Sequence, residues 1–401
     1  MKAVILAAGE GTRMRPLTFT RPKSLIPVAN KPFLSYLLAN LKSAGIREAV
    51  LVVGYQREKV HAAFGEKHNG VKLEYVFQPR PGGTGEALAI AKRFLTDAFL
   101  CLNGDVLYDV QSIKAAMKAG PSTLLSRTVS SPEHYGVLRV KGEKVAEILE
   151  KPEKPPSNLV NAGLYVFDLS IIPLLESLKP SPRGEKEITD ALQPLASRGQ
   201  LRHVTGGQVF EFGFPWHVLE LNEFLLSKLP KTKNPRGATG PVSIGKGTIL
   251  KPGVVIEGPV VIGEKCTIGP NCYIHKNTTI GDNCEIGQAV ELKNSVIFSG
   301  TKIKHLSYVG DSVIGEKVNL AAGTITANLR HDRKNVMMND VDSGRKKLGA
   351  VIGDSVQTGI HTSIFPGKTI GPFSWTSADS IVYSDIPSHS FLLHEGTTKP
   401  I

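Results

Sequence analysis

The chain has 401 residues and a formal net charge of +12, with 41% hydrophobic and 21% charged residues. This composition excludes an intrinsically disordered chain, and at roughly 150 residues per domain the length predicts two or three domains. Aromatic residues make up only 6%, whereas there are 40 glycines and 26 prolines, so turn-forming residues are abundant relative to bulky ones.

The positive charge is spread evenly along the chain. Residues 1–230 carry 29 Lys and Arg against 22 Asp and Glu, and residues 231–401 carry 19 against 14, which gives +7 and +5. Proteins that bind nucleic acids concentrate their basic residues in a patch, so we expect no nucleic-acid partner and favour small anionic substrates.

The chain has no signal for membranes, secretion or metal-binding cysteines. No run of apolar residues approaches the roughly 18 that cross a membrane, so no membrane partner is expected. The apolar N-terminus stops at Gly9, too early for the core of a signal peptide. The four cysteines form no Cys-x-x-Cys pair, which argues against a zinc site and against disulfides. Together these features predict a cytoplasmic protein.

The segment 1–229 alternates between predicted strands and helices and predicts an α/β domain. Strands are expected at residues 2–9, 48–55 and 98–105, and helices at residues 31–45 and 86–95. Such alternation is typical of a mostly parallel sheet with helices on both faces.

Residues 230–241 are rich in Pro, Gly and Lys and predict a linker. Beyond it, Ile or Leu recurs at every sixth position, nine times in succession, at Ile244, Leu250, Ile256, Ile262, Ile268, Ile274, Ile280, Ile286 and Leu292. This period is typical of a left-handed parallel β-helix of hexapeptide repeats, which we expect over residues 242–401. Three hexads would form a coil of roughly 18 residues, and the coils would stack at the ~4.8 Å strand spacing.

A second column of small residues lies four positions after each Ile or Leu and includes Cys266, Cys272 and Cys284. We therefore expect these thiols to pack in the core as small apolar groups. The repeat slips by one residue between Phe298 and Ile303, and the polar, basic segment 327–348 predicts an extended loop that leaves the β-helix.

A loop rich in glycine and arginine joins the first predicted strand to the first predicted helix. Gly9 and Gly11 allow a ligand to approach the backbone closely, and successive N–H groups in such a loop bind anions. The loop carries four cations, Arg13, Arg15, Arg21 and Lys23. Glycines and cations together indicate a polyphosphate site, with a tight turn as the alternative. The loop matches neither the P-loop nor the dinucleotide-binding pattern.

Asp105 follows the third predicted strand, at the edge where parallel sheets bind ligands. Next to a nucleotide, its carboxylate would bind Mg²⁺ together with substrate phosphates. A turn-capping aspartate is the alternative that the residue alone leaves open.

The first half of the chain resembles the sugar-1-phosphate nucleotidylyltransferases along its whole length. The matching motifs are L-A-A-G-x-G-T-R-[ML], R-P-K-x-L-[IV]-P-V and the strand-terminal G-D, followed by GGTGEALA (82–89), HYGVL (134–138), EKP (150–152) and NAGLY (161–165). The resemblance implies a Rossmann-like domain in which a sugar phosphate attacks the α-phosphorus of a nucleotide.

The same resemblance assigns roles to individual residues. The nucleotide would bind to Leu6, Ala8, Gly9, Gly11, Thr12, Gln78, Gly83 and Thr84, the last three reading uracil or thymine. The sugar would bind to Gly136, Glu150 and Asn161. Arg13 would neutralise the leaving pyrophosphate, Lys23 would bind the attacking sugar phosphate, and Asp105 would bind the metal. Where relatives carry an Asp or Asn as second metal ligand, this chain has Glu211, which is expected to bind Mg²⁺ with a longer reach.

The segment 302–329 resembles the acetyltransferase part of bifunctional sugar-1-phosphate nucleotidylyltransferase and amino-sugar-1-phosphate acetyltransferase enzymes, which are GlmU-like and of archaeal type. In that family the histidine of K-x-x-H-L-[ST]-Y-x-G is the general base, and His305 would take this role. Imidazole suits it because it titrates near neutral pH. A solvated surface histidine is the alternative.

Further residues of the second site follow from the same resemblance. The amino-sugar phosphate would contact Lys293, Tyr308 and Asn319, and Asn328 and Lys334 would close the site from a neighbouring subunit. His275 stands where relatives commonly have Arg and should stack beside Lys293, and Met337 replaces a lysine of some relatives. The GRKK run at 344–347 is expected to be a solvated loop face rather than a coenzyme A phosphate site.

The sequence therefore predicts a bifunctional enzyme. The β-helix would acetylate glucosamine 1-phosphate, or galactosamine 1-phosphate, with acetyl-CoA as co-substrate. The N-terminal domain would then join the product to UTP, or dTTP, with Mg²⁺ as cofactor and release pyrophosphate. The expected product is UDP-N-acetylglucosamine, and the resemblance implies a homotrimer packed through the β-helix. One alternative is a nucleotidylyltransferase alone, specific for example for glucose 1-phosphate, with a structural or regulatory β-helix. The other is a non-catalytic subunit of a regulatory complex with the same fold, which the presence of Arg13, Lys23 and Asp105 argues against.

Overall fold

The computed structural model describes residues 1–181, 184–230 and 235–401. Its contacts divide the chain into two units. The N-terminal unit comprises Met1–Glu10, Pro22–Leu25 and Phe33–Phe212, and the C-terminal unit comprises Gly11–Arg21, Ile26–Pro32 and Gly213–Ile401. Most of the glycine- and arginine-rich loop thus belongs to the C-terminal unit. The domain boundaries predicted at 229 and 242 stay predictions, and residues 231–234 of the predicted linker lie outside the described residues.

The core of the N-terminal unit is a set of parallel strands in the order β7 (Phe99–Asn103), β1 (Lys2–Ala7), β4 (Glu48–Val53) and β6 (Val71–Phe77). The sequence predicted β1, β4 and β7. Consecutive residues of β1, such as Val4 and Ile5, are both fully buried, because apolar side chains cover both faces of these strands.

The rest of this sheet differs from the mostly parallel arrangement that the sequence predicted. The sheet continues beyond β7 through β12 (Leu159–Phe167), β9 (Thr123–Thr128), β13 (Arg202–Thr205), β11 (Lys144–Glu150) and β10 (Gly136–Lys141), and ends on its other side at β5 (Lys67–His68). Apart from β13 with β9, the pairs in this extension are antiparallel. The expectation was wrong here because residues 123–167 contain strands joined directly, without the intervening helices that parallel neighbours need.

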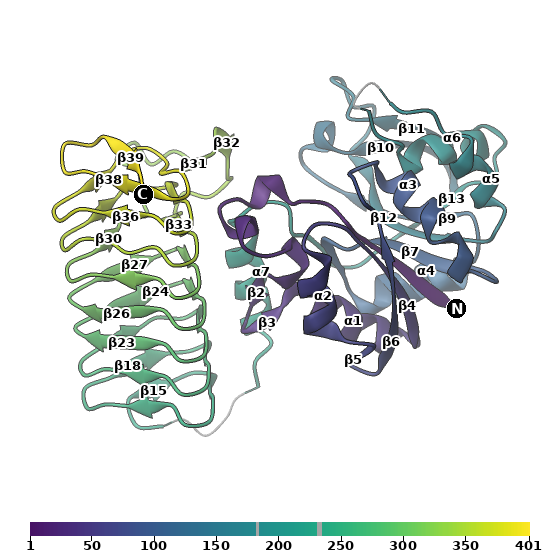
Figure 1. Ribbon diagram of the computed structural model, residues 1–401. Coiled ribbons are helices and arrows are strands. Elements are labelled where there is room, and N and C mark those ends of the chain that lie inside the picture. The colour runs from purple at the N-terminus through teal and green to yellow at the C-terminus, as the bar shows by residue number, and fades with distance from the viewer. Residues whose placement is uncertain (182–183, 231–234) are drawn as a thin grey trace. The chain divides into compact units, whose positions relative to one another are not determined.

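The helices pack in groups against the sheet (Figure 1). They are α1 (Phe33–Ala44), α2 (Arg57–Phe64), α3 (Thr84–Ile90), α4 (Val110–Ala119), α5 (Ile171–Glu176) and α6 (Ile188–Ser197), whereas α7 (His217–Leu226) belongs to the C-terminal unit. Helix α1 packs on α4, and α3 packs on α5 and α6. The helix predicted at 86–95 ends earlier, at Ile90, and no described helix is long and apolar enough to cross a membrane.

Short two-stranded pairings add to each unit. Strand β8 (Val106–Tyr108) pairs with β14 (Val209–Glu211), and β2 (Pro27–Val28) pairs with β3 (Lys31–Pro32). Both pairs are antiparallel, and β8 follows β7 directly, so β14 lies next to the carboxyl end of β7.

Within residues 235–401, the strands stack in parallel sheets (Figure 1). The first sheet contains β15 (Ala238–Thr239), β18 (Val255–Glu257), β21 (Tyr273–Ile274), β24 (Glu291–Lys293), β27 (Tyr308–Gly310), β30 (Ile325–Thr326), β34 (Ser363–Ile364) and β37 (Ile381–Val382). The second contains β16 (Val242–Ile244), β19 (Val260–Ile262), β22 (Thr278–Ile280), β25 (Val296–Ile297), β28 (Val313–Ile314), β33 (Val351–Ile352) and β35 (Thr369–Ile370). The third contains β17 (Ile249–Leu250), β20 (Thr267–Ile268), β23 (Glu285–Gln288), β26 (Lys302–His305) and β29 (Asn319–Leu320). The chain ends with β36 (Trp375–Thr376), β38 (Ser390–Leu392) and β39 (Thr398–Pro400).

The pairing register gives the length of each coil. Val242 pairs with Val260, which lies three hexads later, as the repeat predicts. Further along, Ile280 pairs with Ile297, which falls one position short of three hexads. Because Ile274 still pairs with Leu292, a full three hexads later, the missing residue lies between Leu292 and Ile297. The slip predicted between Phe298 and Ile303 therefore exists but was placed too late in the sequence, because Phe298 was counted in the inward column that Ile297 occupies.

One coil carries the segment predicted to leave the stack. Val313 pairs with Val351, so this coil is longer than its neighbours because residues 327–348 are inserted into it. The inserted segment contains an antiparallel hairpin of β31 (Met337–Met338) and β32 (Val341–Asp342), so it is more ordered than the extended loop that the sequence predicted.

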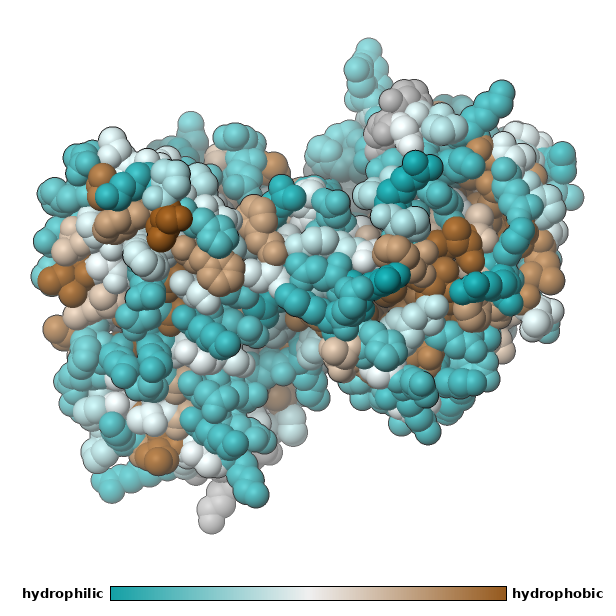
Figure 2. Space-filling view, viewed as in Figure 1, coloured by the Kyte–Doolittle hydropathy of each residue, from teal (hydrophilic) through white to brown (hydrophobic). Residues whose placement is uncertain are grey.

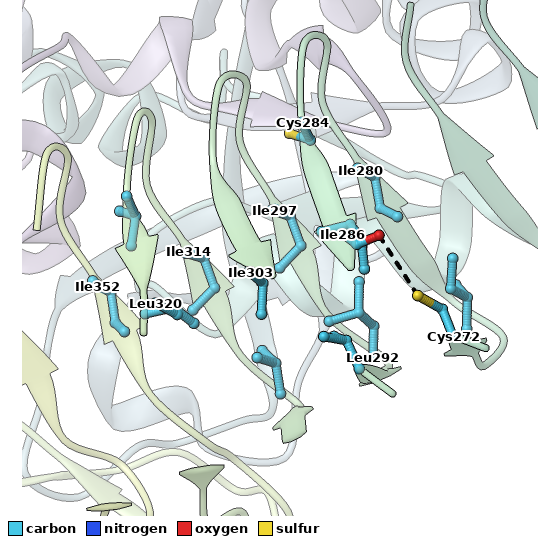
Figure 3. Packing of buried hydrophobic residues seen from close by; sticks show 14 of the residues in the cluster. Cys272, Ile280, Cys284, Ile286, Leu292, Ile297, Ile303, Ile314, Leu320 and Ile352 are labelled. Carbon is cyan, nitrogen blue, oxygen red and sulfur yellow. Dashed lines mark hydrogen bonds between the residues drawn. The ribbon is translucent and has the colours of Figure 1, made fainter. Parts of the chain in front are cut away.

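The interior of the stack is a column of Ile, Leu, Val and Cys (Figure 3). Ile280, Ile286 and Leu292 are fully buried, as are the thiols of Cys272 and Cys284. Successive coils place equivalent residues on top of each other, so only side chains of similar small size fit. This confirms the core role predicted for the cysteines and explains the low aromatic content.

We predict that Ile286→Ala lowers the free energy of unfolding by about 2–5 kcal/mol. The substitution leaves a cavity in the core, and the packed coils on either side of it cannot move in to fill it. Chemical denaturation of the purified protein measures this loss. Ile249→Ala is the matched control, since Ile249 is 60% exposed. Equal loss of stability in both variants would contradict the packing argument.

Candidate active sites

The carboxyl ends of the parallel strands bring the predicted nucleotide residues of the N-terminal unit to one edge. Leu6 pairs with Asn103, and its carbonyl accepts a hydrogen bond from the N–H of Gly104 at 2.8 Å. Ala8 follows β1 and Gln78 follows β6, so both lie at the same edge as Asp105 after β7. Gly9 comes next, and a Cβ on it would have no atom within 4 Å, which leaves room for a ligand.

The GGTG segment lies at this edge in a conformation fixed by residues 186–188. Gly83 has a φ of +90°, and a Cβ there would lie 2.4 Å from the carbonyl oxygen of Lys186, so only glycine fits. The Thr84 hydroxyl accepts a hydrogen bond from the N–H of Ile188 and donates to Glu187. Gln78 is 6% exposed, with Nε2 3.4 Å from the carbonyl oxygen of Gly83. The residues predicted to read the base are therefore neighbours, and the Thr84 side chain also anchors the loop.

The three predicted sugar residues lie together. Gly136 pairs with Glu150 across β10 and β11, and a Cβ on Gly136 would lie 3.3 Å from Glu150 Oε2 and 3.7 Å from Asn161 Cβ. Asn161 Nδ2 donates to the Tyr165 hydroxyl at 2.7 Å, and its Oδ1 accepts from the N–H of Gly163. A carboxylate and an amide thus flank a buried glycine whose missing side chain keeps the space between them clear, which suits hydrogen bonds to sugar hydroxyls.

Lys23 and Asp105 form an ion pair in the N-terminal unit. Lys23 Nζ lies 2.7 Å from Asp105 Oδ2, and the two side chains are 13% and 42% exposed. The partly exposed carboxylate remains accessible to a cation, and the ammonium lies close enough to contact the same ligand.

Glu211 lies next to Asp105 in the backbone, but its side chain binds other groups. Strand β14 pairs Glu211 with Val106, and the N–H of Phe212 donates to the Asp105 carbonyl at 2.9 Å. The Glu211 carboxylate forms an ion pair with Arg127 and accepts a hydrogen bond from the Tyr135 hydroxyl at 2.9 Å. Burial, and then the charge of Glu211, raise the pKa of Tyr135 to about 12. The sequence missed Arg127 and Tyr135, although Tyr135 lies within the HYGVL motif.

Asp105 and Glu211 differ in how well their carboxylates suit a magnesium ion. Asp105 offers an accessible hard oxygen ligand, and Mg²⁺ is commonly bound by one or two carboxylates together with substrate phosphates. Both oxygens of Glu211 already have partners, so it could bind a metal only by leaving Arg127 and Tyr135. The described residues contain no cluster of three or more His, Cys, Asp or Glu side chains of the kind that binds metals. The residues thus fit a one-carboxylate site at Asp105.

The remaining loop residues belong to the C-terminal unit. Gly11 has a φ of +67°, and its carbonyl accepts from the N–H of Met14, which begins a short helical turn containing Thr12 and Arg13. Arg13 is exposed, with its guanidinium carbon 5.1 Å from the centroid of the Phe214 ring. Thr12, Arg13 and Arg15 line a cavity of about 580 Å³ in this unit. Of the four loop cations, Arg13 and Arg15 are therefore accessible to a phosphate.

Arg21 is different from the other loop cations because it is only 9% exposed. Its guanidinium forms ion pairs with Glu316 and Asp354 of the C-terminal stack. The expectation that all four cations bind polyphosphate was wrong for Arg21, because two carboxylates distant in sequence already neutralise it.

The second candidate site lies on the stack. His305 ends β26 and is exposed, and after a two-residue turn Tyr308 begins β27. Tyr308 pairs with Glu291, and Gly310 pairs with Lys293. His305 and Tyr308 therefore lie on either side of a corner of the coil, and Lys293 lies on the neighbouring coil.

Asn328 is positioned by a chain of hydrogen bonds that the sequence did not predict. Its Nδ2 lies 3.2 Å from the Tyr308 hydroxyl and 2.6 Å from Asp311 Oδ2. Asp311 is 4% exposed and accepts from Asn294 at its other oxygen, and Asn294 also donates to Glu223 of α7. The signal for Asp311 was present, since it directly follows the Y-x-G of the histidine motif.

The other predicted residues of this site are more dispersed. Asn319 is exposed on β29 and pairs with Lys302, at the opposite end of β26 from His305. Lys334 is exposed on the inserted segment, where its N–H donates to Asp332, and Met337 begins the hairpin and is 42% exposed. Within one chain, no described contact joins Lys334 to Tyr308 or Asn328.

His275 lies beside Lys293, as their separation of three hexads predicted. The N–H of His275 donates to the carbonyl of Leu292, and its imidazole Nε2 lies 2.8 Å from Glu291 Oε1. Its other ring nitrogen is 3.6 Å from Glu257. Two carboxylates therefore compete with any phosphate for this side chain.

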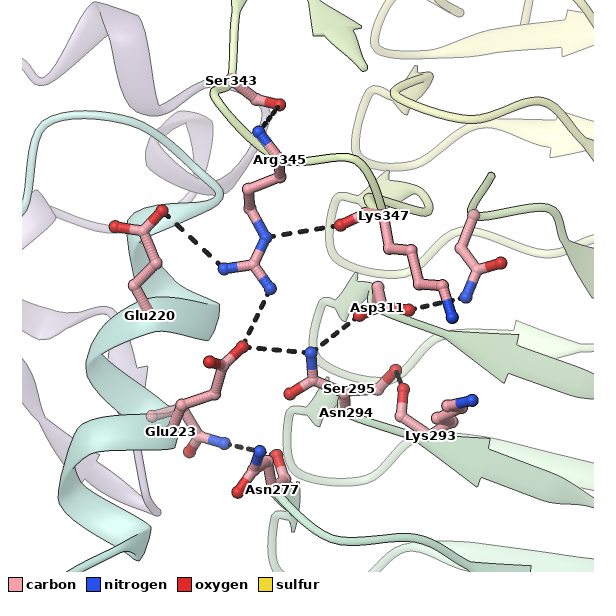
Figure 4. Close-up of polar contacts among 12 residues, drawn as sticks. Glu220, Glu223, Asn277, Lys293, Asn294, Ser295, Asp311, Ser343, Arg345 and Lys347 are labelled. Atoms are coloured by element: carbon pink, nitrogen blue, oxygen red, sulfur yellow. Dashed lines mark hydrogen bonds and ion pairs between the residues drawn. The ribbon is translucent and has the colours of Figure 1, made fainter. Parts of the chain in front are cut away.

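The GRKK run is not a uniformly solvated face. Lys346 and Lys347 are exposed, but the side chain of Arg345 is 17% exposed and pairs with Glu220 and Glu223 of α7 (Figure 4). Burial raises the pKa of Glu220, and the charge of Arg345 opposes this shift. The expectation of a solvated face was therefore wrong for Arg345, which the helix neutralises.

Comparison with known proteins assigns both halves of the chain. The nucleotidyl transferase family model matches residues 2–209, and that of the GMPPB C-terminal domain matches residues 256–374. The bifunctional protein GlmU of Methanococcus maripaludis is 43% identical over 405 residues, which cover 98% of this chain and 97% of that protein. The chain belongs to the bifunctional GlmU family.

Other members and a solved structure agree with this assignment. GlmU of Methanocaldococcus jannaschii is 39% identical over 403 residues, with the same coverage of 98% and 97%. A bifunctional sugar-1-phosphate nucleotidylyltransferase/acetyltransferase of Sulfurisphaera tokodaii is 38% identical over 399 residues, which cover 96% of this chain and 98% of that protein. A putative glucose-1-phosphate thymidylyltransferase from Bacillus anthracis, solved with a sucrose, has a TM-score of 0.53 at 29% identity, over 58% of this chain and 98% of that one.

We predict that the Tyr135 phenol titrates near pH 12, the value to which burial and Glu211 raise its pKa. Because the raised pKa favours the neutral phenol in the folded state, Tyr135 contributes stability below its ordinary pKa of about 10, and this is lost as the pH rises towards 12. Ultraviolet titration of the wild type against Tyr135→Phe isolates this transition. Glu211→Gln should move it to lower pH, and a Tyr135 transition near pH 10 in the wild type would contradict the assigned contacts.

Proposed function

We propose that this member of the GlmU family makes UDP-N-acetylglucosamine through two active sites on one chain. One site transfers the acetyl group of acetyl-CoA to glucosamine 1-phosphate, and the other joins the acetylated sugar phosphate to UTP. The observation that carries the proposal is the similarity, over 96–98% of the chain, to relatives named as bifunctional enzymes. Both activities are expected in the cytoplasm, and a matrix of UTP and dTTP against glucosamine, galactosamine and glucose 1-phosphates defines the substrate range.

In the uridylyl-transfer step, an oxygen of the sugar phosphate attacks the α-phosphorus of UTP. A new P–O bond forms, and the bond to pyrophosphate breaks. Lys23 would bind the attacking phosphate, which is negatively charged and would otherwise be repelled by the nucleotide. Arg13, exposed on its helical turn, would neutralise the pyrophosphate as it leaves. Glu150 and Asn161 would orient the sugar through its hydroxyl and acetamido groups.

Asp105 would bind Mg²⁺, which supplies charge neutralisation on the nucleotide phosphates when it is bound. The ion pair of Lys23 with Asp105 has a role of its own here. The carboxylate keeps the ammonium at the strand edge before substrate arrives, and the arriving phosphate can then compete for it. Glu211 as a second ligand remains part of the proposal only if it leaves Arg127.

In the acetyl-transfer step, the sugar amine attacks the thioester carbonyl carbon. His305 would take the proton from the amine nitrogen as the C–N bond forms, and the C–S bond to coenzyme A then breaks and the thiolate takes up a proton. Lys293 would bind the sugar phosphate, and Tyr308 and Asn328 would bind the sugar. The hydrogen bonds from Asn328 to Tyr308 and Asp311 fix the amide before substrate binds.

The proposed fold of the C-terminal stack is a left-handed parallel β-helix that assembles as a trimer. The parallel register, with coils of three hexads or one residue less, supports the β-helix. Large apolar side chains in the strands of the first sheet, or directly after them, support assembly, because Ile325, Phe365, Ile381 and Tyr383 are between 39% and 60% exposed. Figure 2 shows hydrophobic side chains at the surface of this unit. In a trimer, a neighbouring subunit could supply the contacts that Lys334 lacks within one chain.

We predict that His305→Ala abolishes acetyl transfer and leaves uridylyl transfer within about twofold of the wild type, because the general base belongs to one site only. Separate assays with glucosamine 1-phosphate plus acetyl-CoA, and with N-acetylglucosamine 1-phosphate plus UTP, measure the two steps. His361→Ala, a change of an exposed histidine on the same stack, is the control. Equal loss of both activities, or of neither, would contradict a two-site enzyme.

We predict that Asp105→Asn raises the Mg²⁺ concentration for half-maximal uridylyl transfer by about tenfold or more, whereas Glu211→Gln changes it by less than about threefold, since one carboxylate can suffice for Mg²⁺. Glu211→Gln should instead raise the KM for the sugar phosphate, because it weakens the contacts to Arg127 and Tyr135. A tenfold shift in the Mg²⁺ requirement with Glu211→Gln would restore Glu211 as a metal ligand.

A further inference from the structure

Arg21 forms a buried ion-pair cluster within the C-terminal unit. Its guanidinium contacts Asp354 Oδ2 and lies 3.1 Å from Glu316 Oε1, and the guanidinium carbon is 5.2 Å from the centroid of the Phe298 ring. The neighbouring Thr20 donates its hydroxyl to Asp354 at 2.7 Å. Arg21 is 9% exposed and Asp354 is 8% exposed, so the charge is withdrawn from water and from soluble ligands.

The partners of Arg21 come from three successive coils. Phe298, Glu316 and Asp354 lie in the corners that follow β25, β28 and β33, which are neighbours in the second sheet. Asp354 Oδ1 also accepts from the backbone N–H of Glu316 at 2.8 Å, which fixes the two corners to each other. The inserted segment lies between Glu316 and Asp354 in sequence, so only the stacked fold brings them together.

The two carboxylates of the cluster stabilise the charged form of the Arg21 guanidinium. Burial alone would lower the pKa of Arg21, but the charges of Asp354 and Glu316 outweigh burial and raise it. A buried ion pair contributes little net stability, whereas the loss of one partner leaves a costly unpaired charge. The cluster therefore enforces one geometry more strongly than it stabilises the fold.

Arg21 ends the loop segment that carries Thr12 and Arg13. This segment belongs to the C-terminal unit and has only short helical turns of its own, at Thr12–Met14 and Leu17–Phe19. The Thr18 hydroxyl donates to the Gly11 carbonyl, which links the start of the segment to its end. The position of Arg13 therefore depends on where the end of the segment is fixed.

We propose that Arg21 and Asp354 are positioning residues for nucleotidyl transfer, through which the C-terminal stack fixes the phosphate-binding loop. The inference rests on the proposed function for the uridylyl-transfer step and goes beyond it, because it makes one activity depend on a carboxylate in the part of the chain that carries the other. Lys23 lies two residues after Arg21, so a displacement of the loop would also change the position of Lys23.

The test is Asp354→Asn in the full-length protein, with both activities measured on the same preparation. The change keeps the size of the side chain and one acceptor oxygen for Thr20, but it removes the charge that faces Arg21 and replaces the oxygen that accepts from the N–H of Glu316. We expect kcat/KM for UTP to fall by about 10- to 100-fold, the scale on which small misplacements of positioning groups act. Acetyl transfer should stay within about twofold, which a general loss of folding would not allow.

Two further variants define the pair. Arg21→Gln should lower uridylyl transfer to the same degree, and the double variant Arg21→Gln/Asp354→Asn should be no worse than either single one, because both changes break the same contact.

Glu316→Gln should have a smaller effect, since the Glu316 side chain is 42% exposed. The control is Glu285→Gln, which removes exposed pairs with Lys302 and Lys304 on the same stack and should change neither activity.

Hydrogen exchange gives a readout that does not depend on activity. In Asp354→Asn, the amides of residues 11–19 should exchange faster than in the wild type, while those of β28 and β33 should not change. Uridylyl transfer within twofold of the wild type, a proportional loss of both activities, or unchanged exchange in the loop would overturn the inference. If the wild type itself shows no uridylyl transfer, the proposed function fails, and faster exchange in the loop would then show only that Asp354 fixes the loop.

Discussion

The parallel register of the C-terminal stack is the constraint on which the proposed acetyl-transfer site and the Arg21 cluster both depend. Each residue lies directly beside its equivalent one coil later, so the length of a coil decides which side chains meet. The shortened coil aligns Tyr308 with Glu291, and the coil with the inserted segment returns Asp354 to its place beside Glu316. A single inserted residue without compensation would turn the following side chains from the surface to the interior. The small inward residues, such as Cys272, follow from the same constraint, since a larger side chain would separate adjacent coils.

Features that depend on local period or on strand ends were predictable from the sequence. The six-residue column containing Ile286 forms the core, and Asp105 lies at the carboxyl edge of β7 beside Lys23. The slip in the repeat corresponds to coils that are one residue shorter. The antiparallel half of the N-terminal sheet was missed, because its strands were not read from the sequence and the regular strand–helix alternation was extended over them.

The partners of charged side chains were not predictable, for a physical reason. A charge that is withdrawn from water needs an opposite charge, but that partner can come from any part of the chain that the fold brings near. Arg21 and Asp354 lie near opposite ends of the sequence, and Arg345 is neutralised by α7. Glu211 illustrates the same limit, since its backbone position beside Asp105 was implied by the motif but its ion pair with Arg127 was not.

Because of these ion pairs, the four cations of the glycine- and arginine-rich loop cannot all have the same role. Four cations within a dozen residues indicate a polyphosphate site, yet Lys23 and Arg21 are paired with carboxylates, and only Arg13 and Arg15 are exposed beside aromatic rings. The exposed and the buried arginines therefore have different roles. An exposed guanidinium can follow a ligand whose charge moves during the reaction, whereas a buried one determines where the loop lies before the ligand arrives. A loop with so little secondary structure needs both, because phosphate binding alone would have to supply the energy that orders it.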